Sequence, residues 1–476
     1  MEERSGQPIF LAVFATALVA FVFVGSSTCG SKRAVPTIEA GVAADASALA
    51  IADAAPPPGI SAPIAATRVE GGDVVVVALD VAAKGVRAFR IGADDTIKID
   101  RILIDDVAWV SDAELKIWRA SDGVAVVWRG KRGGKAGRFL AVAGANLVAK
   151  KEPTEVAAGS CATEDALYST DGRRVVARKW GGGTHRYDLR DEDAELDCAA
   201  HRAFAIVDDE DKTNLVLLEG EDKGASDAGA AEGGDGGATT GGSPLGKKTG
   251  ERRLALFDHK AFGEDEQRER AVFTSGDDIG VVRVGTNGSV TMRELAGHDL
   301  GALRKLKRTL TSDDDVVAVD ASPKYVVVVY TADASESCAQ GQAATKVMAM
   351  RLARTPSGDG GVPDAGDDDE PVYELAPGAC GREVGPFFTG PVGEGVSVAW
   401  VERASVRTQE KAPITGLVFR AVGPTGIAPT LGRIDQPADA ISDALCDDTR
   451  CYAVALARKP GADVMVPGFP KILRYP

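Results

Sequence analysis

The chain has 476 residues and a formal net charge of −15, with 44% hydrophobic and only 5% aromatic residues. This hydrophobic content is sufficient for a globular core and excludes a wholly disordered chain. The negative charge argues against nucleic acid and anionic lipid surfaces as partners, because phosphate binding needs clustered lysine and arginine.

The N-terminus carries an apolar segment at residues 9–24, in which only Thr16 is polar. As a helix it would span roughly 24 Å at about 1.5 Å per residue. That is shorter than the hydrocarbon core of a bilayer, about 30 Å. Residues 1–28 are therefore expected to be a signal peptide or a membrane anchor.

Cys29 follows this segment directly and resembles the lipidation site of bacterial lipoproteins. In that family the signal is removed and the cysteine becomes the acylated first residue, which implies Cys29 as the lipidation site. The family has Leu three residues before the cysteine and Gly or Ala just before it. This chain has Ser26 and Thr28 there. An uncleaved anchor and conventional cleavage therefore stay open, and all three readings predict export.

Residues 29–67 are rich in Ala and Pro, including Pro56, Pro57 and Pro58. They contain too little large apolar surface to fold and are expected to form a disordered tether. The body is expected to occupy residues 68–476. Within it, residues 222–250 and 355–371 are glycine-rich and acidic, which predicts two flexible insertions.

A repeated β-hairpin organises the body: two β-rich runs are separated by a turn with Gly, Asp or Lys. The paired segments are residues 74–79 with 86–91, 124–129 with 137–143, 174–180 with 184–189, 203–207 with 214–218, 279–284 with 289–295, 325–330 with 346–352, 396–401 with 415–422, and 452–456 with 472–475. Most of them start about 50 residues apart once the insertions are subtracted, as expected for four-stranded blades.

The sequence therefore predicts an all-β fold, a β-propeller of seven blades, with six or eight as alternatives. Seven follows from assigning the close hairpins at 174–189 and 203–218 to one blade. Runs such as 74–79 and 325–330 are apolar at every position, as expected for strands buried on both faces between blades. Pairing of the first and last strands in one blade would close the ring. Two or three consecutive β-sandwiches are the competing fold.

Six further cysteines are expected to form disulfides, as is typical of exported proteins. Fifteen connectivities exist, and sequential pairing is the simplest. Cys161/Cys198 would then lie within one blade and Cys338/Cys380 would clamp the second insertion. Cys446/Cys451 would enclose one turn. Zinc is the rival, but the chain lacks the CxxC spacing with nearby His that zinc sites prefer.

No catalytic residue, metal site or cofactor is predicted. The four histidines form no metal-ligand spacing, and no GxSxG motif is present. Residues 241–249 approach a phosphate-binding loop, but Lys248 replaces the required Ser or Thr. The acidic residues 313–315 and 364–370 are expected to be solvated loops, and residues 300–310 a surface helix or blade connection. Trp128, Trp180 and Trp400 are expected to pack between blades.

Spacing and hairpin style over residues 68–476 resemble β-propeller-type bacterial surface lipoproteins. The prediction is an exported, membrane-tethered protein of the cell envelope, facing the periplasm or the exterior. It would act as a non-enzymatic binding module for an unknown protein or glycan partner. The alternative is a carbohydrate-active enzyme that uses paired Asp or Glu in the propeller channel.

Overall fold

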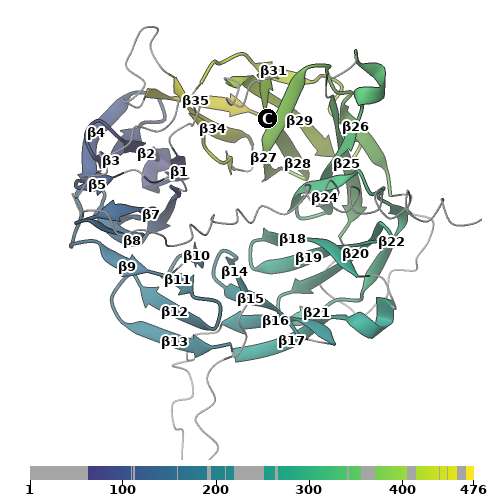
Figure 1. Cartoon of the computed structure of the whole chain (residues 1–476), viewed down its shortest axis with the longest axis horizontal. Helices are drawn as coiled ribbons and strands as arrows, with labels where there is room; N and C mark the ends of the chain where they lie inside the picture. The colour runs from purple at the N-terminus through teal and green to yellow at the C-terminus, as the bar shows by residue number, and fades with distance from the viewer. Residues whose placement is uncertain are drawn as a thin grey trace, which may run out of the picture. The chain divides into compact units, whose positions relative to one another are not determined.

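The computed structural model describes residues 63–476, except for 109, 111–112, 158, 190–193, 210, 219–250, 263–265, 340–341, 343, 355–369, 405–413, 439, 448 and 458–467. All described residues belong to one compact unit, which begins at Asp53. They form β-strands, turns and three short 3-10 segments, with no α-helix among them. The strands make eight separate antiparallel sheets that are arranged in a ring (Figure 1).

The first half of the ring contains four sheets, each built from consecutive strands. Blade 1 has β1 (Ile64–Arg68), β2 (Val74–Asp80), β3 (Gly85–Ile91) and β4 (Ile97–Ile104); blade 2 has β5 (Val107–Ala108), β6 (Leu115–Ala120), β7 (Gly123–Arg132), β8 (Lys135–Gly144) and β9 (Thr154–Val156); blade 3 has β10 (Gly159–Ala162), β11 (Ala166–Thr170), β12 (Arg174–Lys179) and β13 (Thr184–Asp188); blade 4 has β14 (Glu195–Cys198), β15 (Ala203–Asp208), β16 (Lys212–Leu218) and β17 (Glu251–Asp258). The first strands β1, β10 and β14 lie closer to the centre of the ring than the later strands of their blades (Figure 1).

The second half repeats this organisation. Blade 5 has β18 (Gln267–Ser275), β19 (Asp278–Gly285), β20 (Ser289–Ala296), β21 (Asp299–Leu300) and β22 (Arg304–Thr309); blade 6 has β23 (Asp315–Ala321), β24 (Tyr325–Asp333), β25 (Thr345–Ala353) and β26 (Val372–Ala376); blade 7 has β27 (Arg382–Val392), β28 (Gly395–Ala404), β29 (Ile414–Gly423), β30 (Gly426–Ile427) and β31 (Gly432–Ile434); blade 8 has β32 (Ala440–Ile441), β33 (Leu445–Cys446), β34 (Cys451–Ala457) and β35 (Phe469–Tyr475). The 3-10 segments are η1 (Glu70–Gly72), η2 (His259–Phe262) and η3 (Ser335–Ser337).

The fold is an eight-bladed β-propeller, so the expected all-β propeller is confirmed and the expected count of seven blades is wrong. Each of the eight predicted hairpins lies in its own blade. Six of them are the central pair, whereas the hairpin at 174–189 is the outer pair of blade 3, β12 with β13, and the hairpin of 452–456 with 472–475 is β34 with the edge strand β35. The hairpins starting at Arg174 and Ala203 belong to neighbouring blades, because very short connections join β13, β14 and β15. The basic segment expected as a helix or connection forms β22, an outer strand of blade 5.

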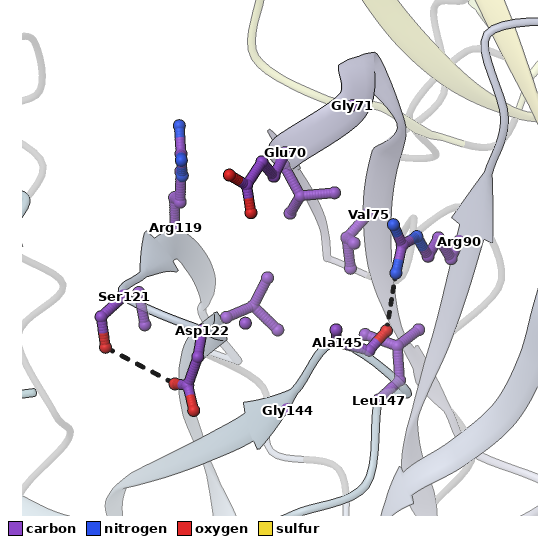
Figure 2. A pocket seen from close by; sticks show the side chains of 14 residues that line it. Glu70, Gly71, Val75, Arg90, Arg119, Ser121, Asp122, Gly144, Ala145 and Leu147 are labelled. Carbon is purple, nitrogen blue, oxygen red and sulfur yellow. Dashed lines mark hydrogen bonds between the residues drawn. The ribbon is translucent and has the colours of Figure 1, made fainter.

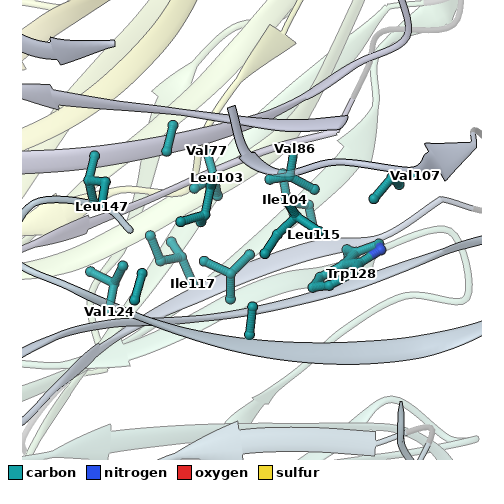
Figure 3. Close-up of a cluster of buried hydrophobic side chains, with 14 of the residues drawn as sticks. Val77, Val86, Leu103, Ile104, Val107, Leu115, Ile117, Val124, Trp128 and Leu147 are labelled. Atoms are coloured by element: carbon teal, nitrogen blue, oxygen red, sulfur yellow. The ribbon is translucent and has the colours of Figure 1, made fainter. Parts of the chain in front are cut away.

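Eight apolar clusters hold the ring together, one at each boundary between neighbouring blades. The central strands supply both sides: Val75 and Val77 of β2 pack toward blade 2, while Val74 and Val76 pack toward blade 8. Figure 3 shows the cluster between blades 1 and 2, around Trp128. This two-sided burial explains why these runs are apolar at every position.

The ring closes by side-chain packing between blades 8 and 1, not by the expected pairing of first and last strands. β1 pairs with β2, and β35 pairs with β34. At this boundary Ile472 and Val454 pack against Val76, and Arg68 Nη1 lies 2.8 Å from Asp447 Oδ2. This apolar cluster and the ion pair therefore join blades 8 and 1 in place of strands paired within one sheet.

Asp447 organises both this closure and its own turn. It accepts hydrogen bonds from the amides of Thr449 and Arg450, at 2.8 and 3.0 Å, and from the Tyr452 hydroxyl at 3.1 Å. Burial opposes ionisation, but these hydrogen bonds hold the pKa of Asp447 well below its usual range.

We expect Asp447→Asn to lower the free energy of unfolding by about 1–3 kcal/mol at pH 7, because a charged acceptor is lost. A depressed carboxyl pKa contributes stability above the unfolded value, about 3.9, and this contribution is lost as pH falls through the folded value. The difference in unfolding free energy between the variant and the native chain should therefore narrow below about pH 4. Urea unfolding across pH tests this, with the more exposed Asp95→Asn of the Arg474 pair as control. An unchanged stability at pH 7 would contradict the assignment.

Three disulfides join Cys161 to Cys198, Cys338 to Cys380 and Cys446 to Cys451, the pairs expected from sequential order. Two of them lie elsewhere than expected. The first joins β10 of blade 3 to β14 of blade 4 and does not lie within one blade. The second ties the β24–β25 connection to the link into blade 7, at the end of β25 and β26 opposite to the second insertion.

Blade 1 begins within the segment expected to be tether, since Ile64–Arg68 form β1. The apolar N-terminal segment, Cys29, the phosphate-loop-like residues 241–249 and most of both insertions lie outside the described residues. Within the described part, the search for a helix long and apolar enough to cross a membrane finds none.

Candidate binding cavity and axial carboxyl groups

A cavity of about 510 Å³ lies between blades 1 and 2, at the end of the blades where first and second strands are joined. The β1–β2 turn, the β6–β7 turn and the segment after β8 line it (Figure 2). These turns carry Glu70-Gly71-Gly72 and Ser121-Asp122, residues that favour tight turns. Ser121 and Asp122 form the two-residue hairpin connection between β6 and β7.

The floor of the cavity is apolar and belongs to the core between the two blades. Val75, Val124 and Leu147 line it, and each is 1% exposed. Leu147 has a φ of 58°, in the left-handed region that costs a non-glycine residue about 1–2 kcal/mol. Backbone strain of this kind is concentrated at functional sites, which supports a binding role for this cavity.

One wall is held by a buried network around Asp73, which is 4% exposed. Lys98 Nζ donates to Asp73 Oδ1 at 2.8 Å, and Arg90 Nε donates to Oδ2 at 2.7 Å. These two cations, Lys98 first, hold the pKa of Asp73 below its usual range. Arg90 also donates to the Ala145 carbonyl of blade 2 at 2.9 Å, as Figure 2 shows. Arg90 therefore fixes the two sides of the cavity relative to each other.

The rim carries opposite charges from the two blades. Glu70 of blade 1 and Arg119 of blade 2 are exposed, and in the described part of the chain neither makes a hydrogen bond or ion pair (Figure 2). Asp122 differs, because Lys150 binds its carboxylate and lowers its pKa. Glu70 and Arg119 are therefore the charges available to a ligand.

A second, shallower pocket of about 300 Å³ continues from the same turn toward blades 3 and 4. It shares Arg119 and Ser121 with the first and adds Trp118 and Glu164. His201 Nδ1 lies 3.7 Å from Glu164 Oε2 at this margin. The two pockets together make a hollowed region around the β6–β7 turn.

Three carboxyl groups with raised pKa lie on or beside the innermost strands of blades 4, 6 and 8. Burial raises the pKa of Asp197 and of Asp443, and Lys116 of blade 2 opposes this shift at both. Burial raises the pKa of Asp320 to about 6, although the Ala321 amide donates to it at 2.7 Å. These side chains reach solvent, but the surrounding ring removes much of the bulk water.

The remaining residues singled out from the sequence are structural. Trp128 and Trp400 are buried in the clusters between blades, as expected. Trp180 is partly buried and donates to the Thr163 carbonyl at 3.3 Å. Asp314 accepts from the Thr311 amide at 2.7 Å and so shapes a turn. No cluster of three or more His, Cys, Asp or Glu that could hold a metal occurs among the described residues.

Sequence reasoning missed the cavity residues Glu70, Arg90 and Arg119 and the axial carboxyl groups. The only local signals were a turn at Glu70-Gly71-Gly72 and the alternation Glu195-Leu196-Asp197 on an inner strand. Neither signal shows which side chains meet across a blade boundary.

No known family and no curated protein matches the sequence. Solved structures with a similar arrangement include Kluyveromyces lactis Hsv2, at 7% identity and a TM-score of 0.45, covering 79% of this chain and 99% of that chain. The WD40 domain of SCAP from fission yeast has 9% identity and a TM-score of 0.41, covering 83% and 93%. A prolyl endopeptidase has 12% identity and a TM-score of 0.38, covering 88% and 47%. At these identities and TM-scores, none of the three transfers a function to this chain.

Proposed function

We propose that the propeller is a non-enzymatic binding module of the cell envelope, which faces the periplasm or the exterior. The cavity between blades 1 and 2 carries this proposal. Its floor is apolar, and its rim offers Glu70 and Arg119 without partners in the described part of the chain. Concave sites with an apolar lining and few polar groups are typical of ligand binding.

The chemistry fits an exposed segment of a partner protein that carries apolar side chains and both charges. Arg119 is the anchor expected to contribute most, because arginine is enriched among residues that dominate interface energetics. Among the side chains that line the two pockets, the Ser121 hydroxyl donates to Asp122 at 3.5 Å. Lys150 binds this carboxylate and lowers its pKa, which makes it a weak base and favours binding over group transfer.

Export and membrane attachment complete the proposal. Three disulfides support folding in an oxidising compartment. The apolar segment and Cys29 support attachment through the N-terminus, by acylation or by an uncleaved anchor. The intact mass of the membrane-extracted protein tests this: residues 1–28 retained without acyl chains would contradict lipidation.

We expect Arg119→Glu to weaken binding of the partner at least tenfold, or about 1.4 kcal/mol, because the charge at the rim is reversed. The partner is first captured by crosslinking and affinity purification of the tagged full chain from its native envelope, and its affinity is then measured. Arg186→Glu, the same charge reversal on the outer strand of blade 3, is the control. If both variants bound the partner with the affinity of the native chain, the binding site would not be this cavity.

A carbohydrate-active enzyme is the second candidate, supported by Glu195 and Asp197 on one face of β14. Two residues along a strand span about 7 Å, within the separation that glycosidase carboxyl pairs use. However, Arg270 Nη2 lies 2.8 Å from Glu195 and neutralises it. Glycan hydrolysis that is lost in Asp197→Asn would favour this candidate over the binding module.

A further inference from the structure

Blade 8 contains one strand position fewer than the other blades. β32 and β33 pair with successive parts of one edge of β34, and β35 pairs with its other edge. Within the described residues no strand pairs with the outer edge of β35. The other seven blades have a further strand outside the equivalent of β35, such as β4 in blade 1 and β31 in blade 7. The edge of β35 is therefore recessed by one strand, about 4.8 Å.

The wall of this notch on blade 1 carries two isoleucines and the ion pair of Arg87 with Asp100, and the strand register shows which way it faces. Ile91 packs toward blade 8, and its partner across the ladder is Ile97. Ile102 is paired with Arg87, which lies on the same face of β3 as Ile91. Side chains paired across a ladder share a face. Ile97 and Ile102 therefore point to the position that a fourth strand of blade 8 would occupy.

The wall on blade 7 is formed by Phe419 and Ile434, which belong to the cluster between blades 7 and 8. Both are only partly buried. The Phe419 ring lies 5.3 Å from the ring of Tyr475, the last residue of β35. The notch thus has apolar side chains on both sides, and no strand of the described residues pairs with the edge at its base.

Exposed apolar residues gather around this notch. Among the described residues, the large hydrophobic side chains with the greatest exposure are Ile97, Ile102, Val148, Leu303, Leu431 and Phe469. Four of these six lie on blades 7, 8 and 1. Single exposed apolar residues are common, but a group beside an open sheet edge marks an interaction site.

A second copy of the chain does not fit this edge. Two recessed edges that faced each other would be held about two strand widths apart by the projecting walls. β35 also contains Pro470 and the exposed Lys471, and both are typical of edges that avoid pairing between whole sheets. The occupant must therefore be a single extended segment.

We propose that an extended segment of a partner protein enters this notch and forms the missing fourth strand of blade 8. Its backbone would pair with the edge of β35, as in other cases of strand addition. The residues that face blade 1 would be β-branched and apolar, to cover Ile97 and Ile102. The residue opposite Lys471 would be acidic, because opposite charges across a ladder stabilise the pairing.

The test uses the full chain with its disulfides intact and a displayed library of random heptapeptides. Selection should enrich peptides with alternating apolar β-branched residues and an acidic residue between them. The Val454 backbone is hydrogen-bonded to Ser442, so the amides of its ladder partner Ile472 and of Arg474 point to the open edge of β35. The synthetic form of an enriched peptide should protect these two amides from hydrogen exchange. Its affinity should fall at least tenfold in Ile102→Asp and in Ile97→Asp.

Val148→Asp is the matched control, because Val148 is 47% exposed and lies on blade 2. The three variants change exposed positions, and their circular dichroism should match the native chain. Arg119→Glu should leave peptide binding unchanged, since the notch lies on the opposite face of blade 1 from the cavity. The experiment can therefore contradict the proposal for the notch without contradicting the proposal for the cavity, and the reverse.

Two outcomes would overturn the proposal directly: enrichment of no peptide, or binding that survives both isoleucine substitutions. Protection of the Ile472 and Arg474 amides without peptide would also overturn it. In a monomer by sedimentation, that protection would assign the notch to another part of the same chain. In a dimer, it would assign the notch to a second copy.

Discussion

Replacing Arg354 with alanine is expected to lower the free energy of unfolding by about 3–5 kcal/mol at neutral pH, because a buried charge loses its partner. Arg354 follows β25 of blade 6, and its side chain is only 8% exposed. Its guanidinium lies 2.8 Å from Asp278 and 3.1 Å from Glu294, both on blade 5, and donates to the Ser322 carbonyl at 3.2 Å. One side chain thus joins two blades.

This loss should depend on pH. Burial raises the pKa of Glu294, while Arg354 opposes that shift. For a carboxyl with a raised pKa, the cost of ionisation to folding builds up as pH rises from the unfolded pKa, about 4.3, to the folded pKa, and it persists in full above that. Without Arg354 the folded pKa of Glu294 rises further, and the cost of its ionisation grows. The difference in unfolding free energy between the variant and the native chain should therefore narrow as pH falls toward 4.

Urea unfolding followed by tryptophan fluorescence at pH 7 and pH 5 provides the measurement. The control is Lys324→Ala, which removes an exposed ion pair with Glu394 on the neighbouring blade. Exposed pairs of this kind are screened by water and contribute little to stability. If the two variants lost equal stability at pH 7, Arg354 would not be the buried link described above.

The second large effect is expected from removing the disulfide between blades 3 and 4. Cys161 and Cys198 are 37 residues apart, and the chain-entropy model assigns a loop of this length about 4 kcal/mol. The buried cluster on the other side of blade 3, toward blade 2, is small, with Trp118 and Trp180 packed at its edge around Leu167, so the disulfide adds a covalent link beside a small core. The double variant Cys161→Ser/Cys198→Ser should therefore lose that stability.

Removal of the disulfide between Cys446 and Cys451 is the comparison. Its separation of 5 residues corresponds to about 2 kcal/mol in the same model. Denaturant unfolding of both double variants should rank the first as the less stable. The reverse ranking would contradict the entropic account of the link between blades.

The hairpins were predictable from sequence because the responsible interactions are local. Runs such as Tyr325-Val326-Val327-Val328-Val329 disclose a strand buried on both faces, and the turns carry Gly and Asp. The blade count was not predictable in the same way. It depended on whether the short link between Asp188 and Glu195 stays within one sheet or starts another.

The cavity residues were less accessible to sequence reasoning than the fold. Glu70 and Arg119 each lie in an ordinary polar context, and only the packing of blade 1 on blade 2 places them on one rim. The same holds for Asp447, whose role in closing the ring depends on Arg68 at the far end of the chain. A local pattern carries no information about such pairs.

By itself, the sequence determined that the chain is an all-β protein of repeated hairpins, where its turns lie, and which runs are buried on both faces. These properties follow from side-chain periodicity and from the backbone preferences of a few neighbouring residues. The tertiary structure alone decided that there are eight blades, that packing closes the ring, and that the described residues leave blade 8 without an outer strand. The physical reason is that these features arise where strands far apart in sequence meet, and there volume, charge and register are set by both partners together.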